Sequence, residues 1–240
     1  SEDEAAERLL REAKKILKRL EDAARESLKS AERILEELEK AARDSLRKAE
    51  KIIRDAKRKG LDEKALKRAK EALEKAERDH RRALKRAREA IEEAAKRHKE
   101  ALEEAERAIK RAEEEARKAK KESDERTAAK RLLDAVKELA DAAKKAADRA
   151  LKANEDLARA AKEAADEALE ANKRLAKALR DDTTDKEAEK LATKLVEDSE
   201  RAAREAKKLA DENVKRSKEA AEEAKRLADR LVKEAEDDAR

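Results

Sequence analysis

Apolar residues recur at an interval of 18 along this 240-residue chain. Leu66 returns as Leu84 and Leu102, Ile16 returns as Ile34, and all four helical segments of the sequence show the same interval. Because 18 residues make five whole turns of an α-helix, a side chain comes back to the same side of its helix after each interval. A heptad repeat instead drifts by about 20° per repeat and imposes a left-handed supercoil. The interval therefore predicts nearly straight helices with a fixed apolar stripe.

The composition allows two readings, and the interval decides between them. Charged residues make up 55% of the chain, aromatic residues, Pro, Cys and Met are absent, and Gly60 is the only glycine. This composition is typical of long helices and coiled coils. High charge with low hydrophobicity is also typical of disordered chains. The regular apolar stripes favour a folded, helical chain.

Three breaks interrupt the helical pattern. Gly60 followed by Asp62 predicts a helix end and a new N-cap. The second break has N-cap residues but no glycine, which leaves open whether the helix turns back at Ser123 or continues. The third contains a capping box of Thr184 and Glu187. We therefore expect four helices, each about 85 Å long, over approximately 2–59, 62–121, 125–180 and 185–239.

Each predicted helix carries polar residues inside its apolar stripe, again 18 residues apart. They are Ser27 and Ser45, His80 and His98, Asn154 and Asn172, and Ser199 and Ser217, with Asn213 on the same face. Residues of antiparallel neighbours that lie at one height are equidistant from the connecting loop. The midpoint in sequence between Ser27 and His98 falls in the first break. The midpoint between His98 and Asn154 is Arg126, and that between Asn154 and Ser217 lies beside Asp185. Their positions predict an up-down-up-down path of the chain.

The polar residues are expected to meet in two layers about 27 Å apart. One layer holds Ser27, His98, Asn154, Asn213 and Ser217, and the other holds Ser45, His80, Asn172 and Ser199. A buried polar atom without a partner costs about 1–3 kcal/mol, so we expect hydrogen bonds within each layer that fix the helix register. The prediction is all-α: a single-chain antiparallel up-down-up-down four-helix bundle, long and nearly untwisted, forming one domain over residues 1–240.

The histidines are the residues that most invite a catalytic or metal-binding hypothesis. A metal site usually needs three or four His, Cys or carboxylate ligands around one point, whereas each layer offers one histidine. A serine nucleophile needs a base that a third group orients, together with an oxyanion hole, and the core face shows no carboxylate for that role. We therefore predict no catalytic residue, no metal and no cofactor.

Nucleic acid and membranes are also disfavoured as partners. The 68 basic and 63 acidic residues alternate along every segment, whereas a nucleic-acid interface is usually a basic stripe with aromatic side chains. Interfacial membrane helices usually carry Trp or Phe on the apolar face. No apolar run approaches the roughly 20 residues of a membrane-spanning helix. We expect a soluble chain that requires no partner.

The third predicted helix has an additional stripe of alanines, which widens its apolar arc. Its members are Ala135, Ala142, Ala146, Ala153, Ala160, Ala164, Ala171 and Ala178. One interpretation is close helix–helix approach combined with high helix propensity. The alternative is a flat docking face for another helix or for a second copy of the chain. The pattern leaves both open.

The chain resembles computationally designed helical bundles with buried hydrogen-bond networks. The resemblance covers the whole chain and rests on the 18-residue repeat, the Ser/His/Asn layers, the short capped loops and the Glu/Lys/Arg surface. It implies a rigid structural scaffold or spacer without a natural substrate, made by recombinant expression in the cytoplasm of a host. The alternative that it implies is an assembly module: a building block, or a pair of helical hairpins that docks partner helices through the alanine face or self-associates.

Overall fold

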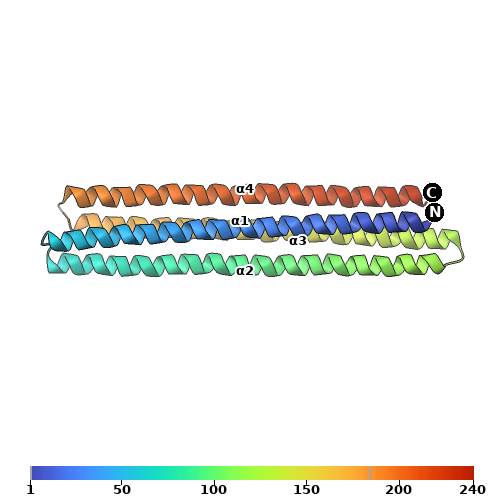
Figure 1. The fold of residues 1–240 in the computed structure, drawn as a ribbon, viewed down its shortest axis with the longest axis horizontal. Helices are drawn as coiled ribbons and strands as arrows, with labels where there is room; N and C mark the ends of the chain where they lie inside the picture. Colours follow the sequence, from blue (N-terminus) through green and yellow to red (C-terminus); the bar gives the residue numbers. More distant parts are fainter. Residues whose placement is uncertain (1, 184) are drawn as a thin grey trace. The chain divides into compact units, whose positions relative to one another are not determined.

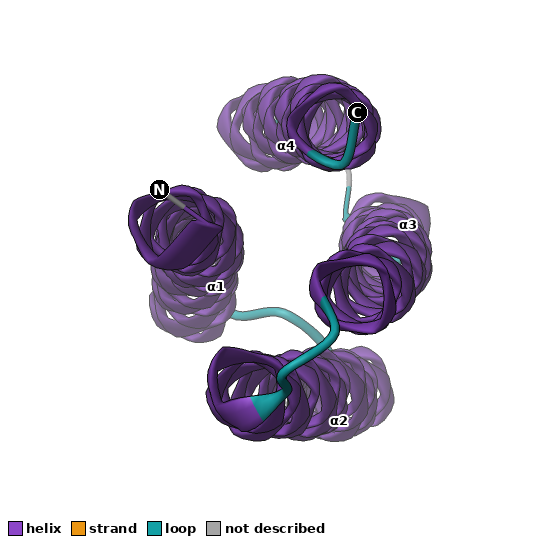
Figure 2. Cartoon of the chain, turned by 90° about the vertical axis from the view of Figure 1, so that its right-hand side faces the viewer, coloured by secondary structure: helices purple, strands orange, loops and turns teal. Residues whose placement is uncertain are grey.

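The computed structural model describes residues 2–183 and 185–240. They form four helices, α1 (Glu2–Arg58), α2 (Glu63–Lys121), α3 (Glu125–Asp181) and α4 (Lys186–Asp238) (Figure 1). Consecutive helices pack against each other in a four-helix bundle, and the described residues contain no strand (Figure 2). The predicted all-α class is confirmed, and the helix bounds agree with the expected ranges to within a residue or two.

The loop between α1 and α2 forms because Gly60 adopts a left-handed conformation with φ of +82°. The N–H of Leu61 donates to the carbonyl of Ala56 at 3.0 Å, and the N–H of Gly60 donates to that of Lys57 at 3.2 Å. This pair of bonds is the Schellman motif, which satisfies the last carbonyls of a helix. The carbonyl of Asp62 then accepts the first hydrogen bond of α2.

The loop between α2 and α3 turns the chain back without a glycine. Asp124 caps α3: its Oδ1 accepts the N–H of Arg126 at 3.2 Å, and its Oδ2 accepts the hydroxyl of Thr127 at 2.8 Å. An N-cap carboxylate satisfies amide groups that have no partner within the helix. The sequence left open whether the helix continues past Ser123, and the structure shows that it ends at Lys121.

The loop between α3 and α4 is capped by Asp185. Its Oδ1 accepts the N–H of Glu187 at 3.1 Å, and its own N–H donates to the hydroxyl of Thr183 at 3.1 Å. The predicted capping box involves Thr184, which lies outside the described residues. The carbonyl of Asp185 accepts the first described helical bond, from Glu189 at 3.1 Å.

The chain divides into two compact units, and each helix contributes a segment to both. Unit 1 comprises Ser1–Leu28, Glu93–Glu155 and Asn213–Arg240, and unit 2 comprises Lys29–Glu92 and Asp156–Glu212. The expectation of one domain over residues 1–240 stays a prediction.

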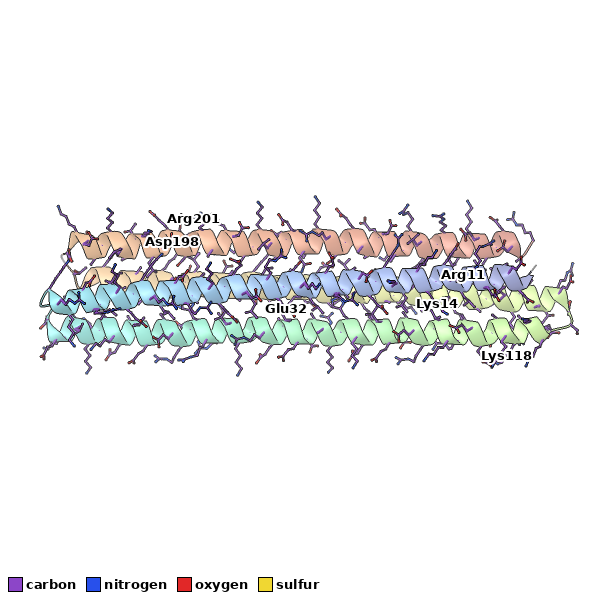
Figure 3. All side chains as sticks on the ribbon, in the orientation of Figure 1. Arg11, Lys14, Glu32, Lys118, Asp198 and Arg201 are labelled. Carbon is purple, nitrogen blue, oxygen red and sulfur yellow. The ribbon has the colours of Figure 1, made fainter. Side chains whose placement is uncertain are left out.

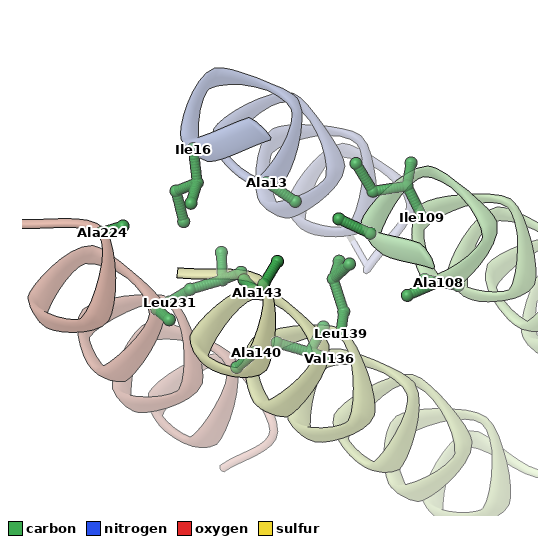
Figure 4. Packing of buried hydrophobic residues seen from close by; sticks show 14 of the residues in the cluster. Ala13, Ile16, Ala108, Ile109, Val136, Leu139, Ala140, Ala143, Ala224 and Leu231 are labelled. Atoms are coloured by element: carbon green, nitrogen blue, oxygen red, sulfur yellow. The ribbon is translucent and has the colours of Figure 1, made fainter. Parts of the chain in front are cut away.

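The core of unit 1 is built from one apolar stripe of each helix. Ile16 of α1, Ile109 of α2, Leu139 of α3 and Leu231 of α4 are all buried and belong to one cluster. Figure 4 shows these side chains with alanines between them. Alternating large and small residues let the stripes interdigitate, which excludes water from the interior. In unit 2 the corresponding core includes Ile52, Ala76, Leu175 and Leu195.

The charged side chains project away from the helices (Figure 3). None of the large hydrophobic residues in the described part of the chain is exposed. Ion pairs connect neighbouring helices, such as Arg19 with Glu223 at 2.7 Å in unit 1 and Arg88 with Glu39 at 2.9 Å in unit 2. None of the helices, over the residues described, combines the length and apolar character that crossing a membrane requires.

Candidate functional site

The structure places all nine polar residues of the predicted layers in the interior, where none is more than 8% exposed. They lie in two clusters. The first cluster, in unit 1, consists of Ser27, His98, Asn154, Asn213 and Ser217. The second cluster, in unit 2, consists of Ser45, His80, Asn172 and Ser199.

Asn154 of α3 is the centre of the first cluster. Its Oδ1 accepts the hydroxyl of Ser27 (α1) at 2.6 Å and lies 2.7 Å from Nε2 of His98 (α2). Its Nδ2 donates to the hydroxyl of Ser217 (α4) at 2.9 Å. One side chain thus bonds to all three other helices. Asn213 adds a bond from α4 to α1, because its Nδ2 donates to the carbonyl of Ser27 at 3.2 Å.

Asn172 of α3 has the same central position in the second cluster. Its Oδ1 lies 2.8 Å from Nε2 of His80 (α2). Its Nδ2 donates to the hydroxyls of Ser45 (α1) at 3.0 Å and Ser199 (α4) at 2.7 Å. Both serines direct their own hydroxyl hydrogen to a carbonyl of their own helix, Ala41 at 2.9 Å and Leu195 at 2.8 Å.

These contacts fix the protonation of both histidines. An asparagine oxygen can only accept, so Nε2 of each imidazole carries the hydrogen and Nδ1 is the bare nitrogen. Nδ1 of His80 and Nδ1 of His98 are buried without a hydrogen-bond partner. Burial lowers the pKa of both imidazoles, more than the asparagine bonds raise it. The clusters therefore hold neutral histidines, because a second N–H at Nδ1 would have no acceptor.

The arrangement joins helices and does not align a nucleophile with a base. In both clusters the imidazole Nε2 bonds to an asparagine oxygen, and the serine hydroxyls donate to an asparagine or to a backbone carbonyl. Among the described residues, no group of three or more His, Asp or Glu side chains is placed to hold a metal ion. The chemistry that these contacts provide is mutual satisfaction of buried polar atoms.

The alanine stripe of α3 lies mostly inside the bundle. Ala135, Ala146, Ala153, Ala164 and Ala171 are at most 6% exposed, and the other three predicted members are Ala142, Ala160 and Ala178, which are half-buried. Neighbouring helices of this chain already cover most of the surface that a docking face would need. This burial favours close helix packing, the first of the two interpretations drawn from the sequence, and the docking face stays a prediction.

The structure contains a set of ion pairs between α3 and α4 that was not predicted from the sequence. Its members are Lys144–Asp229 and Asp148–Lys225 in unit 1, and Lys162–Asp211 and Asp166–Lys207 in unit 2. Each pair of unit 1 has its counterpart in unit 2 at an interval of 18 in both helices. The same interval that located the polar layers could have located these pairs, had it been applied to charged residues.

The two asparagine-centred clusters are built from the same kinds of side chain. Each brings an amide, an imidazole and two hydroxyls from four helices into direct contact inside one unit. No family model, no curated protein and no solved structure matches the chain.

Proposed function

We propose that this chain is a structural scaffold or spacer and not an enzyme. The observation that carries the proposal is that Asn154 hydrogen-bonds to Ser27, His98 and Ser217, one on each of the other helices. Asn172 forms the equivalent set in the second cluster. The polar groups of the interior are used to hold the helices to one another.

Such clusters select a single helix register. A slip of one residue moves a side chain about 1.5 Å along its helix and rotates it by about 100°. That slip would remove an asparagine from its three partners and leave several buried donors unpaired, each at about 1–3 kcal/mol. Apolar stripes of similar leucines and alanines tolerate slips more readily. The clusters therefore support a rigid element with one arrangement of its helices.

We also propose that the sequence was designed. The 18-residue interval governs three independent features: the apolar stripes, the buried polar residues and the Lys–Asp pairs between α3 and α4. A chain built by repeating one block within each helix would show this agreement. The designed bundles that the sequence resembles use buried polar networks in the same way, to specify pairing.

Spin-label distances test the spacer hypothesis. The chain has no cysteine, so labels can be attached to Lys118→Cys in unit 1 and Arg201→Cys in unit 2, both at exposed positions. A spacer gives one narrow distance distribution, as narrow as that of a control pair within unit 1, Arg11→Cys with Lys118→Cys. A broad or two-peaked distribution for the first pair alone would contradict the proposal.

Light scattering tests the competing hypothesis of an assembly module. The chain has a mass of 27.1 kDa, and a scaffold that requires no partner keeps this mass over a wide range of concentration. A mass that rises with concentration would favour self-association. The same measurement should be made on the double variant Ala142→Glu with Ala160→Glu. It places charges at two half-buried positions of the alanine stripe of α3.

A further inference from the structure

Unit 1 contains a cavity of about 330 Å³ between the four helices, beside the α2–α3 loop. Its wall is formed by short apolar side chains from α1, α2 and α3, among them Ala6, Leu9, Ala116, Ala119, Leu132 and Leu133. The cavity lies next to the packed cluster that contains Leu9. It is separate from both polar clusters.

The sequence of α2 explains why this space is not filled. Leu102 and Ile109 are its last large apolar residues, and the turns that follow present Ala112, Ala116 and Ala119 to the interior. α1 faces them with Ala5 and Ala6, and α4 with Ala235. Methyl groups at these positions cannot span the distance that isoleucine and leucine span deeper in unit 1.

The wall favours an apolar occupant over water. The cavity is open to solvent, and charged side chains line it together with the alanines and leucines. The alanine and leucine side chains themselves offer water no hydrogen-bond partner, whereas a well-held water needs two to four. A dry apolar cavity of roughly 150 Å³ is enough to bind benzene. A cavity of about 330 Å³ therefore has room for a two-ring hydrocarbon. It also lies within the size range of small-molecule sites, about 300–1,000 Å³.

The mouth of the cavity is acidic. Four carboxylates line it, those of Asp3, Glu122, Glu125 and Asp238, together with the single ammonium of Lys120. Lys120 pairs with Asp3 at 4.0 Å, and Asp238 pairs with Arg8 at 2.6 Å. No basic side chain of the described residues forms an ion pair with Glu122 or Glu125. Glu122 accepts the N–H of Asp124 at 3.4 Å, and the negative charges of Glu122 and Glu125 are the ones at the rim that attract a cation.

We propose that this cavity is a binding site for small amphiphilic organic cations, with an aromatic or alicyclic body in the cavity and an ammonium group at the rim. The body gains from leaving water for the alanine and leucine wall. The ammonium remains hydrated at the mouth and is attracted by Glu122 and Glu125. The site is independent of the proposed scaffold function.

The probe for the test is 1-naphthylmethylamine. The protein has no Phe, Tyr or Trp, so the fluorescence of the naphthyl group is observed without a protein signal, and its anisotropy rises on binding. Two molecules of similar size complete the series: 1-naphthylmethanol, which is neutral, and 1-naphthoate, which is anionic. The amine is expected to bind most tightly, the alcohol less, and the anion at least about tenfold more weakly than the amine.

Two variants of the full chain locate the binding. Ala6→Leu with Ala119→Leu replaces two wall methyl groups by isobutyl groups and is expected to weaken amine binding at least about tenfold, because the space is filled. Ala90→Leu, at a half-buried position in unit 2, is the matched control and leaves binding unchanged. Glu122→Gln with Glu125→Gln is expected to bring the affinity of the amine down to that of the alcohol.

Three results would overturn the inference. They are the absence of amine binding to the unmodified chain, equal binding of all three probes, and undiminished binding to the variant with two leucines. Circular dichroism of each variant shows whether it is folded. Because the glutamine variant changes no wall residue, it tests the rim even if the leucine variant is misfolded.

Discussion

The two buried clusters contain the same residue types but form different hydrogen bonds. In the first cluster the asparagine oxygen accepts two hydrogens, from Ser27 and His98, and the amide donates one bond. In the second cluster the oxygen accepts one hydrogen, from His80, and the amide of Asn172 donates two bonds. The serine of α1 is therefore a donor to asparagine in one cluster and an acceptor in the other.

One substitution in α4 accompanies this difference. Asn213 belongs to the first cluster, and the residue 18 positions before it is Leu195, which is fully buried in unit 2 and is not part of the second cluster. Asn213 ties the Ser27 carbonyl to α4, whereas Leu195 packs into the apolar core of unit 2. A repeat in the sequence therefore fixes which groups meet, while the choice of donor and acceptor depends on the local surroundings.

The largest expected effect comes from replacing the central asparagines. Asn154→Leu is expected to lower the free energy of unfolding by about 3–4 kcal/mol, because the N–H of His98 and the hydroxyl of Ser27 lose their acceptor. Asn172→Leu is expected to cost about 1 kcal/mol less, since both serines of that cluster already donate to their own helix. Guanidinium unfolding measures both values. Equal losses would show that the two hydrogen-bond patterns do not differ in energy.

Exchanging the residue that distinguishes the clusters has the next largest effect. Leu195→Asn is expected to destabilise the protein by about 2–3 kcal/mol, because a buried apolar side chain is lost and only partly replaced by a bond to the carbonyl of Ser45. Asn213→Leu is expected to change the stability by less than about 1 kcal/mol, since the Ser27 carbonyl retains its helical partner. A large loss from Asn213→Leu would mean that this amide holds α4 against α1.

Acid is expected to destabilise both clusters. Burial lowers the pKa of His80 and His98 below the ordinary value of 6.5. Below pH 6.5 these imidazoles therefore bind protons more readily in the unfolded chain than in the folded chain. Stability is nearly complete well above pH 6.5 and is lost as the pH falls through 6.5 toward the folded pKa, by at most about 1.4 kcal/mol per pH unit for each histidine. Guanidinium unfolding at pH 7.5, 6.5 and 5.5 measures this slope.

The control for the acid experiment is His80→Gln with His98→Gln. Glutamine keeps an amide hydrogen for the asparagine oxygen but does not titrate in this range. The variant is expected to have a nearly flat stability over the same pH values. If its slope equals that of the unmodified chain, the acid sensitivity comes from carboxylates and not from the clusters.

The smallest expected effect is a change in the pKa values of the two histidines on adding salt, because their charged neighbours have opposite signs. Asp79 raises the pKa of His80, whereas Arg97 lowers that of His98. Added salt screens both charges, so the pKa of His80 is expected to fall and that of His98 to rise. Two imidazole signals in an NMR titration, assigned with the single glutamine variants, measure the shifts. Movement in the same direction would contradict this account.

Much of the fold was predictable because helix formation and helix ends depend on local sequence. Gly60 and Asp62 mark the first loop, and the structure shows the Schellman motif there. The second loop was harder to predict, because Asp124 competes as a cap with its neighbours Ser123 and Thr127. Only the geometry shows that Asp124 accepts from Arg126 and Thr127.

The members of the polar clusters were also predictable, since the interval of 18 places them on one helix face. Their bonds were not. Ser27 donates to Asn154, whereas Ser45 donates to its own helix, and this choice depends on the spacing of side chains from different helices. The cavity of unit 1 was not predicted either, although the alanines at the end of α2 are visible in the sequence, because a gap depends on what all four helices present at one level.

The helical segments, the first loop at Gly60 and the residues that share each face follow from the sequence, because α-helical periodicity and helix capping act within a single segment. Tertiary structure alone decided which atom of each asparagine bonds to which helix, that the alanine stripe of α3 is mostly covered, and that a cavity remains in unit 1. These features depend on the spacing of side chains from different helices, and the periodicity of a single helix gives no information about that spacing.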